Sequence, residues 1–267
     1  MTDAAALPVL LRQLRLPTMA SCSDEVIQRA VDQGWGVAAT LATLCEYELA
    51  QREQRRLARH LHEARLPAGK TLERFDLNIL PSAERQQLST LACDTQWIER
   101  ARNLLLFGPS GVGKSHLATA IGHALIDQGL RVRYFSASAL VQELQAAKQA
   151  LRLAEALAKL DKYPLLIIDD IGYVKRSEGE TSVLFELIAH RYEAGSLLIT
   201  SNQPFSGWDQ IFADDMMAVA AIDRLIHHAH VIELRGESYR KRAFKSQRKE
   251  TPTPKTTDVT HLIDRTE

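Results

Sequence analysis

The sequence predicts an α/β protein in which a parallel five-stranded sheet lies between helices, preceded by a small all-α domain. After about residue 75, short apolar strands alternate with helices, which is typical of a parallel sheet covered on both faces. Before residue 68, apolar residues recur only at helical spacing. The 267 residues are 45% apolar and 25% charged, which excludes whole-chain disorder and collagen-like or mucin-like chains.

Residues 1–68 are expected to form the helical domain, with a role in DNA binding and assembly. Its first apolar positions are Leu7, Leu10, Leu11 and Leu14, and Pro17 ends that segment. Ser23, followed by two acidic residues, predicts the N-cap of a second helix. A long helix follows from about 37 to 64, and the Pro- and Gly-containing segment 66–70 predicts a domain boundary.

The second part, residues 69–249, is expected to hold the sheet. Strands are predicted at 103–107, 131–136, 165–169, 196–201 and 231–234. Helices are predicted at 114–127, 139–160 and 181–193, with helical stretches near 209–212 and 217–227. The remaining residues, 250–267, are rich in Thr, Pro and charge and predict a flexible tail.

A glycine-rich loop between the first strand and its helix is the strongest functional signal. It consists of Gly108, Pro109, Ser110, Gly111, Val112, Gly113, Lys114 and Ser115, and it matches G-x-x-x-x-G-K-[ST]. Inward-facing backbone N–H groups and the helix N-terminus suit phosphate oxygens. We expect this loop, with His116, to bind ATP, with Lys114 at the β- and γ-phosphates and Ser115 on Mg²⁺. The alternative is an ordinary glycine-rich turn.

Two carboxylates follow the fully apolar strand 165–168. They stand at the end of a strand, where ligands bind in parallel sheets. We expect Asp169 to hold Mg²⁺, directly or through water, and Asp170 to orient or deprotonate the attacking water. The alternative for such a pair is a helix cap or turn, and the upstream phosphate loop favours the functional interpretation.

The charge balance hides local basic segments. Lys plus Arg and Asp plus Glu both number 33, which by itself argues against nucleic-acid binding. However, residues 235–249 contain seven basic residues, including Arg242 and Lys245. The long N-terminal helix carries a basic stripe on one face, made of Arg52, Arg55, Arg56 and Arg59. These residues suit a DNA backbone, and the alternative for the stripe is a solvated face paired with Glu48 and Glu53.

Other features of the sequence argue against disulfides, zinc sites and membrane segments. Three cysteines, Cys22, Cys45 and Cys93, match neither a disulfide framework nor a zinc spacing. The cluster of His227, His228 and His230 matches no zinc template, so no metal is expected there. The N-terminus lacks a signal-peptide core and no apolar run is long enough to span a membrane. We therefore expect a cytoplasmic protein without membrane partners.

The two motifs, with later segments, resemble those of AAA+ ATPases. More narrowly, they are similar to the IstB-like transposition ATPases and their relatives, the DnaC/DnaI helicase loaders. The resemblance rests on residues 103–117, 165–173, 199–205 (ITSNQPF), 221–226 (AIDRLI) and 236–240 (GESYR), and on the N-terminal residues 14–20 (LRLPTMA). It implies a P-loop AAA+ core behind the helical domain.

The resemblance also assigns roles to three further residues. Asn202 matches the sensor position beside the γ-phosphate, with a turn asparagine as the alternative. Arg224 matches the arginine finger that acts on a neighbouring subunit, with a salt bridge to Asp223 or Glu233 as the alternative. Arg240 is either a second sensor or a basic surface residue. The expected catalytic set is thus Lys114, Asp170, Asn202 and Arg224.

The implied function is an ATPase that uses ATP and Mg²⁺, self-associates into a ring or helical oligomer on double-stranded DNA and recruits a transposase during insertion-sequence transposition. Because aspartate at position 170 is shorter than the glutamate of many AAA+ proteins, slow or stimulated hydrolysis is expected. The motifs leave open a replicative helicase loader. Alternatives of other classes are a P-loop small-molecule kinase and a nucleotide-gated DNA scaffold without turnover.

Overall fold

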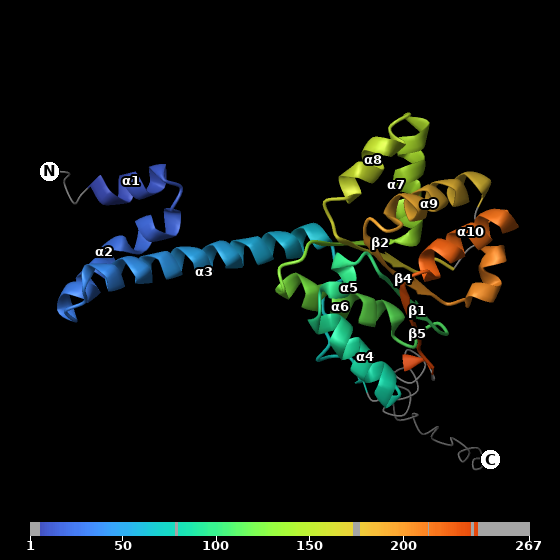
Figure 1. The fold of residues 1–267 in the computed structure, drawn as a ribbon, viewed down its shortest axis with the longest axis horizontal. Helices are drawn as coiled ribbons and strands as arrows, with labels where there is room; N and C mark the ends of the chain where they lie inside the picture. Colours follow the sequence, from blue (N-terminus) through green and yellow to red (C-terminus); the bar gives the residue numbers. More distant parts are fainter. Residues whose placement is uncertain (1–5, 78–79, 173–176, 213, 236–237, 240–267) are drawn as a thin grey trace, which may run out of the picture.

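The computed structural model describes residues 6–77, 80–172, 177–212, 214–235 and 238–239 (Figure 1). It confirms the predicted fold class, a parallel five-stranded sheet between helices with a helical segment in front. The predicted residues Arg240, Arg242 and Lys245 and the tail 250–267 lie outside the described residues.

The sheet has the order β2-β3-β4-β1-β5, and every neighbouring pair is parallel. Its strands are β1 (Asn103–Phe107), β2 (Val132–Ser136), β3 (Leu165–Asp169), β4 (Ser196–Ser201) and β5 (Ala229–Glu233). β1, β3 and β4 are buried along their whole length, because helices cover both faces. Parallel pairing brings the carboxyl ends of all strands to one edge, where the predicted site residues follow β1, β3 and β4.

Two apolar clusters fill the space on either side of the sheet. One packs alternate strand residues against α4 (Ser82–Cys93), α5 (Gln96–Glu99) and α6 (Lys114–Asp127). The other packs the opposite strand residues against α7 (Ala137–Gln149), α8 (Leu153–Leu160), α9 (Glu178–Arg191), the short 3₁₀ helix η3 (Phe205–Gln210) and α10 (Asp215–Ile226). These layers hold the strand ends, and therefore the site, in fixed positions.

The helix predicted over 139–160 is wrong, because the chain forms two helices there. Two residues after the end of α7, Leu151 lies in the left-handed region at φ +55°. The N–H groups of Arg152 and Leu151 donate to the carbonyls of Ala147 and Lys148 at 2.8 and 3.0 Å. This is the hydrogen-bond pattern of a helix end that glycine usually makes. Since no glycine stands at this position, the sequence carried no signal for the break.

The N-terminal helices form a separate packing unit. α1 (Leu7–Gln13) and α2 (Pro17–Asp32) pack along the N-terminal half of the long helix α3 (Val37–Ala64), whose other end reaches the core (Figure 1). Leu11, Met19, Ala20, Val26 and Leu44 form the buried centre of this front unit. Ala64, at the last turn of α3, instead belongs to the apolar cluster of the core.

The predicted N-cap at Ser23 is also wrong, since Ser23 is buried inside α2. The helix already begins at Pro17, which suits the first helical position because it has no N–H to satisfy. The next two N–H groups, of Thr18 and Met19, donate to Glu48 Oε2 of α3 at 2.8 and 3.0 Å. A distant carboxylate therefore accepts the helix N–H groups that the sequence assigned to a local serine.

Within the described part of the chain, no helix is both long enough and apolar enough to cross a membrane.

Candidate nucleotide-binding site

A cavity of about 520 Å³ opens at the carboxyl ends of the strands. Its lining includes the predicted loop from Ser110 to His116, together with Asp170 and Asn202. These residues follow β1, β3 and β4, which are neighbours in the sheet. The structure thus brings together most of the residues that the sequence predicted for the nucleotide site.

The glycines of the loop leave no space for side chains. Gly108 has a φ of +144°, and a Cβ there would collide with the carbonyl oxygen of Leu234. Gly113 has a φ of +105°, and a Cβ there would lie 2.6 Å from Cε2 of Phe75. Both the conformation and the close approach therefore require glycine, as expected for a backbone that wraps around phosphate groups.

Lys114 lies at the centre of the loop. Its ammonium group donates to the carbonyl oxygens of Gly108 and Pro109 at 2.7 and 2.9 Å, and the residue is only 7% exposed. Lys114 also begins α6, so the cation and the positive end of the helix dipole coincide. This arrangement suits an anionic ligand with more than one phosphate group.

The two aspartates after β3 have different surroundings. Asp169 is buried and accepts the hydroxyl of Thr200 on Oδ1 at 2.6 Å and that of Tyr134 on Oδ2 at 2.7 Å. Asp170 is exposed, lines the cavity and has a φ of +67°. A left-handed residue with a Cβ costs about 1–2 kcal/mol, so its surroundings must hold it there. Its N–H donates to Thr200 Oγ1 at 2.8 Å.

Burial, together with the hydrogen bond to Asp169, raises the pKa of Tyr134 well above its ordinary value. The phenol therefore stays protonated and remains a donor to the carboxylate. Both hydroxyl donors to Asp169 are uncharged, so they orient the carboxylate without neutralising it. Each of its oxygens retains a lone pair for a cation or for a water bound to one.

Asn202 brings a buried hydrogen-bond acceptor to the site. Its Oδ1 is buried and has no hydrogen-bond partner among the described residues. A buried amide oxygen of this kind requires a donor, such as a water molecule. Together with the glycine loop and the buried ammonium, this fits a nucleotide with its attacking water. Ser115 and Asp169 are the residues that would hold Mg²⁺, which prefers oxygen ligands.

Arg224 does not lie among the described residues that line this cavity. It is on α10, where its Nη1 donates to the carbonyl of Ala220 at 2.8 Å and its guanidinium lies over the Phe185 ring, 5.2 Å from the centroid. Glu233, one alternative partner, is ion-paired with Arg235 at 2.8 Å. The position of Arg224 therefore leaves a role toward another subunit as a proposal.

The basic stripe on α3 is partly neutralised. Arg52 donates to Glu48 at 3.0 Å and to the carbonyl of Arg15 at 2.7 Å, and Arg56 pairs with Glu53 at 2.6 Å. Both acids are therefore paired as the alternative interpretation expected. Arg55 and Arg59 are exposed on the same helix. Neither of these two arginines forms an ion pair with another described residue, so the structure favours them as the unpaired cations of the stripe.

Comparisons with known proteins show the family to which the chain belongs. The family described as IstB-like ATP binding protein matches residues 9–247. The chain belongs to this family. A relative from Sinorhizobium fredii, named as an insertion-sequence ATP-binding protein, is 49% identical, covering 90% of this chain and 81% of its own. A relative from Pseudomonas aeruginosa, named for insertion sequence IS21, is 37% identical and covers 88% of both chains.

Solved structures share the fold of this IstB-like chain. The DnaI crystal structure has a TM-score of 0.50 at 23% identity, covering 63% of this chain and 89% of its own. DnaA from Aquifex aeolicus, bound to the ATP analogue AMPPCP, has a TM-score of 0.51 at 21% identity, covering 70% of this chain and 56% of its own. At such identities the likeness shows the AAA+ fold alone, which is the predicted fold.

In this IstB-like chain, one wall of the cavity consists of residues that were not predicted as site residues. That wall includes Lys70 from the predicted boundary segment 66–70, Arg74, Phe75 and Asp76 shortly after it, and Tyr239 from near the end of the described chain. His116 anchors the segment, since its Nε2 lies 2.9 Å from the Thr71 carbonyl oxygen and its ring meets the Phe75 ring at 5.4 Å. No motif marks residues 70–76, and although Tyr239 stands in the GESYR segment, the contacts of all these residues arise only from the folding of the chain.

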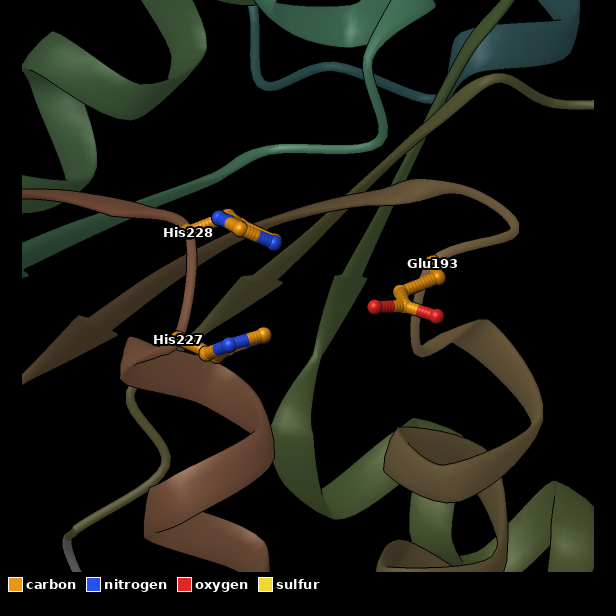
Figure 2. A group of neighbouring side chains, drawn as sticks. All are labelled: Glu193, His227 and His228. Carbon is orange, nitrogen blue, oxygen red and sulfur yellow. The ribbon is translucent and has the colours of Figure 1, made fainter.

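Two histidines at the end of α10 form a cluster with a glutamate that the sequence pattern did not include. Glu193 points toward His227 and His228 from a separate loop (Figure 2), and their ligand atoms lie within 4.8 Å of one another. His230 instead lies 3.4 Å from Gln87. All three clustered side chains are exposed, and His227 is already hydrogen-bonded to the Tyr192 hydroxyl at 2.8 Å. The cluster lies after α9 and α10, at the opposite edge of the sheet from the nucleotide cavity.

Proposed function

We propose that this chain binds ATP with Mg²⁺ in the cavity and hydrolyses ATP to ADP and phosphate. The observation that carries the proposal is the convergence of three strand ends on one cavity: the glycine loop with buried Lys114, then Asp170, then Asn202 with its unsatisfied buried oxygen. Phosphoryl transfer needs positioning and charge stabilisation more than covalent chemistry by the protein, and these groups supply both.

Each group then has a defined part in the reaction. Lys114 would contact the β- and γ-phosphates, while Ser115 and Asp169 would hold Mg²⁺, which would neutralise charge on the phosphate oxygens. Asp170 would accept the proton of the attacking water or orient it, and Asn202 would hold the same water. Because Asp170 has a short side chain, we expect slow turnover that DNA or a partner stimulates.

We further propose that ATP controls assembly of this chain on double-stranded DNA, where it recruits and stimulates a transposase. Support comes from relatives named for insertion sequences and from the exposed Arg55 and Arg59 on α3. Arg224, which is not among the described residues that line the cavity, would act on the nucleotide of a neighbouring subunit, which requires a ring or helical oligomer.

A replicative helicase loader is the second candidate. One observation favours it: the crystal structure of the DnaC helicase loader has a TM-score of 0.50 at 16% identity, covering 60% of this chain and 96% of its own. Capture of a transposase rather than a helicase from the native host would decide between the two. Monomeric behaviour with ATP and phosphate transfer to a small molecule would instead indicate a kinase.

The test of ATP binding is Lys114→Ala against Lys162→Ala, because Lys162 is an exposed lysine outside the cavity lining. Loss of a charged hydrogen-bond donor should weaken binding of a fluorescent ATP analogue by about 100-fold, and the control should bind normally. Imaging of the wild-type protein with DNA, Mg²⁺ and the analogue then reports oligomer size and the position of DNA. Equal binding by both variants would refute the site.

A further inference from the structure

Thr200, in β4, contacts three consecutive residues, the last of β3 and the two that follow it. Its hydroxyl donates to Asp169 Oδ1 at 2.6 Å and accepts the N–H of Asp170 at 2.8 Å. Its carbonyl oxygen accepts the N–H of Ile171 at 3.0 Å. The residue is fully buried. One hydroxyl therefore joins the carboxylate proposed to hold Mg²⁺ to the backbone of the residue proposed to orient water.

The turn that Thr200 holds is strained at Asp170. With a φ of +67°, Asp170 occupies the left-handed region that a residue with a Cβ avoids. Such a conformation persists only where the surrounding contacts determine it. The hydrogen bond from the Asp170 N–H to Thr200 is one of these contacts, and it sets the direction in which Asp170 leaves the strand toward the cavity.

Asp169 is oriented from both of its sides. Thr200 contacts one oxygen, and Tyr134 of β2 donates to the other at 2.7 Å. Because β3 lies between β2 and β4 in the sheet, the two donors reach the carboxylate from opposite neighbours. A carboxylate fixed in this way cannot rotate without breaking a hydrogen bond to a buried or half-buried hydroxyl.

We infer that Thr200 is a positioning residue for ATP hydrolysis, which sets the geometry of Asp169 and Asp170 together through one hydroxyl. The inference rests on the proposed hydrolysis. Thr200→Val keeps the branched shape but removes the hydroxyl, so the Asp170 N–H loses its acceptor and Asp169 loses a donor. The hydrogen bonds of Lys114 to the loop carbonyls involve other residues and should persist.

The experiment compares Thr200→Val, Thr200→Ser and Tyr134→Phe. Misplacement of Asp170 in Thr200→Val should lower kcat by about 100-fold, with ATP-analogue affinity changed by less than about threefold. Thr200→Ser keeps the hydroxyl and should recover kcat to within about threefold of wild type. Tyr134→Phe affects Asp169 alone, so it should raise the Mg²⁺ requirement while lowering kcat less than Thr200→Val does.

Thr181→Val is the matched control, because Thr181 is a fully buried threonine of α9 whose hydroxyl donates to carbonyls near its own helix start. Wild-type kcat in Thr200→Val would overturn the inference. So would an equal loss of kcat and of melting temperature in Thr200→Val and Thr200→Ser, which would indicate a purely structural role.

Failure of the proposed hydrolysis gives a different result. If the wild-type protein binds ATP but shows no turnover with DNA, the proposed function fails at that step. Thr200 is then judged from the Mg²⁺ dependence of ATP binding. A Thr200→Val variant that needs no more Mg²⁺ than wild type would overturn the inference in that case too.

Discussion

The nucleotide-binding core and the front helices are held together by different means. The core buries two apolar clusters on opposite faces of its sheet, and most of their strand residues are fully buried. Among the described residues, the front unit buries six apolar side chains, five of them in one cluster, and relies on the carboxylate of Glu48, which is 2% exposed and joins α2 to α3. The core is thus stabilised by burial, whereas the attachment of α1 and α2 depends on a few polar contacts.

The largest difference in free energy of unfolding should appear when one large aliphatic side chain in each part is shortened to alanine. Changing Ile121, which is fully buried in the core, to Ala should lower the free energy of unfolding by about 3–4 kcal/mol. Leu44→Ala in the front unit should cost about 2 kcal/mol, since its small cluster can collapse onto the gap. Denaturant unfolding monitors both changes. Equal costs would contradict the comparison.

Removing the polar attachment should release α1 and α2 without harming the core. Glu48→Ala leaves the N–H groups of Thr18 and Met19 without their acceptor, which should cost about 2–3 kcal/mol locally. Alkylation of the half-buried Cys22 should then speed up relative to the exposed Cys45. Glu46→Ala, an exposed change on the same helix, is the control. ATP binding should stay normal in both variants.

Acid should weaken the front unit through the same group. Burial opposes ionisation of Glu48, but the N–H groups of Met19 and Thr18 and the Arg52 guanidinium outweigh it and lower the pKa of Glu48 below its ordinary value of 4.5. Its stabilising contribution is therefore present above pH 4.5 and is lost as the pH falls from there through the lowered folded-state pKa.

Acrylamide quenching of tryptophan fluorescence would follow this transition. Trp35 packs partly buried against the front cluster, whereas Trp97 and Trp208 are buried in the core. Quenching of Trp35 should rise in acid before the core tryptophans become accessible. In Glu48→Ala this early phase should disappear, because α2 is already released. An unchanged early phase in that variant would assign the acid sensitivity to other groups.

The smallest expected effect concerns the basic stripe on α3. Changing Arg55 and Arg59 to Gln should weaken DNA binding and reduce the slope of log affinity against log salt by about 2, one unit for each arginine that no longer neutralises a phosphate. The matched control is Arg12→Gln with Arg100→Gln, two exposed arginines away from the stripe. Melting temperature should not change in either double variant. The same salt slope in both would move the DNA-binding surface elsewhere.

Much of the core could be predicted from sequence, because the residues of each strand or helix carry their own local pattern. The bounds of β1, β3 and β4 and of α6 agree with their apolar patterns, because each is a continuous buried segment next to a turn signal. The glycine loop and Asp170 could be predicted for the same reason, since each directly follows such a strand and parallel pairing brings strand ends together, whereas Asn202 was predicted from the family resemblance.

The rest depended on contacts between distant residues. Glu48 caps a helix 30 residues away, and Phe75 reaches the loop around Gly113, with no motif at either position. Thr200 lies in segment 199–205, which carries the family resemblance. Its hydrogen bonds to Asp169 and Asp170 depend on the pairing of β3 with β4, which the sequence alone does not show. Side chains that act through tertiary hydrogen bonds leave little trace in a one-dimensional pattern.

The most direct test of the proposed ATPase is turnover by Asp170→Ala, measured with and without DNA beside ATP binding and assembly in the same samples. The wild-type protein should hydrolyse ATP slowly and faster with DNA. Asp170→Ala should bind ATP and assemble normally while its turnover falls by about 100-fold or more, since only the water-orienting carboxylate is removed. Wild-type turnover by Asp170→Ala, or loss of its ATP binding, would contradict the proposed role of this cavity.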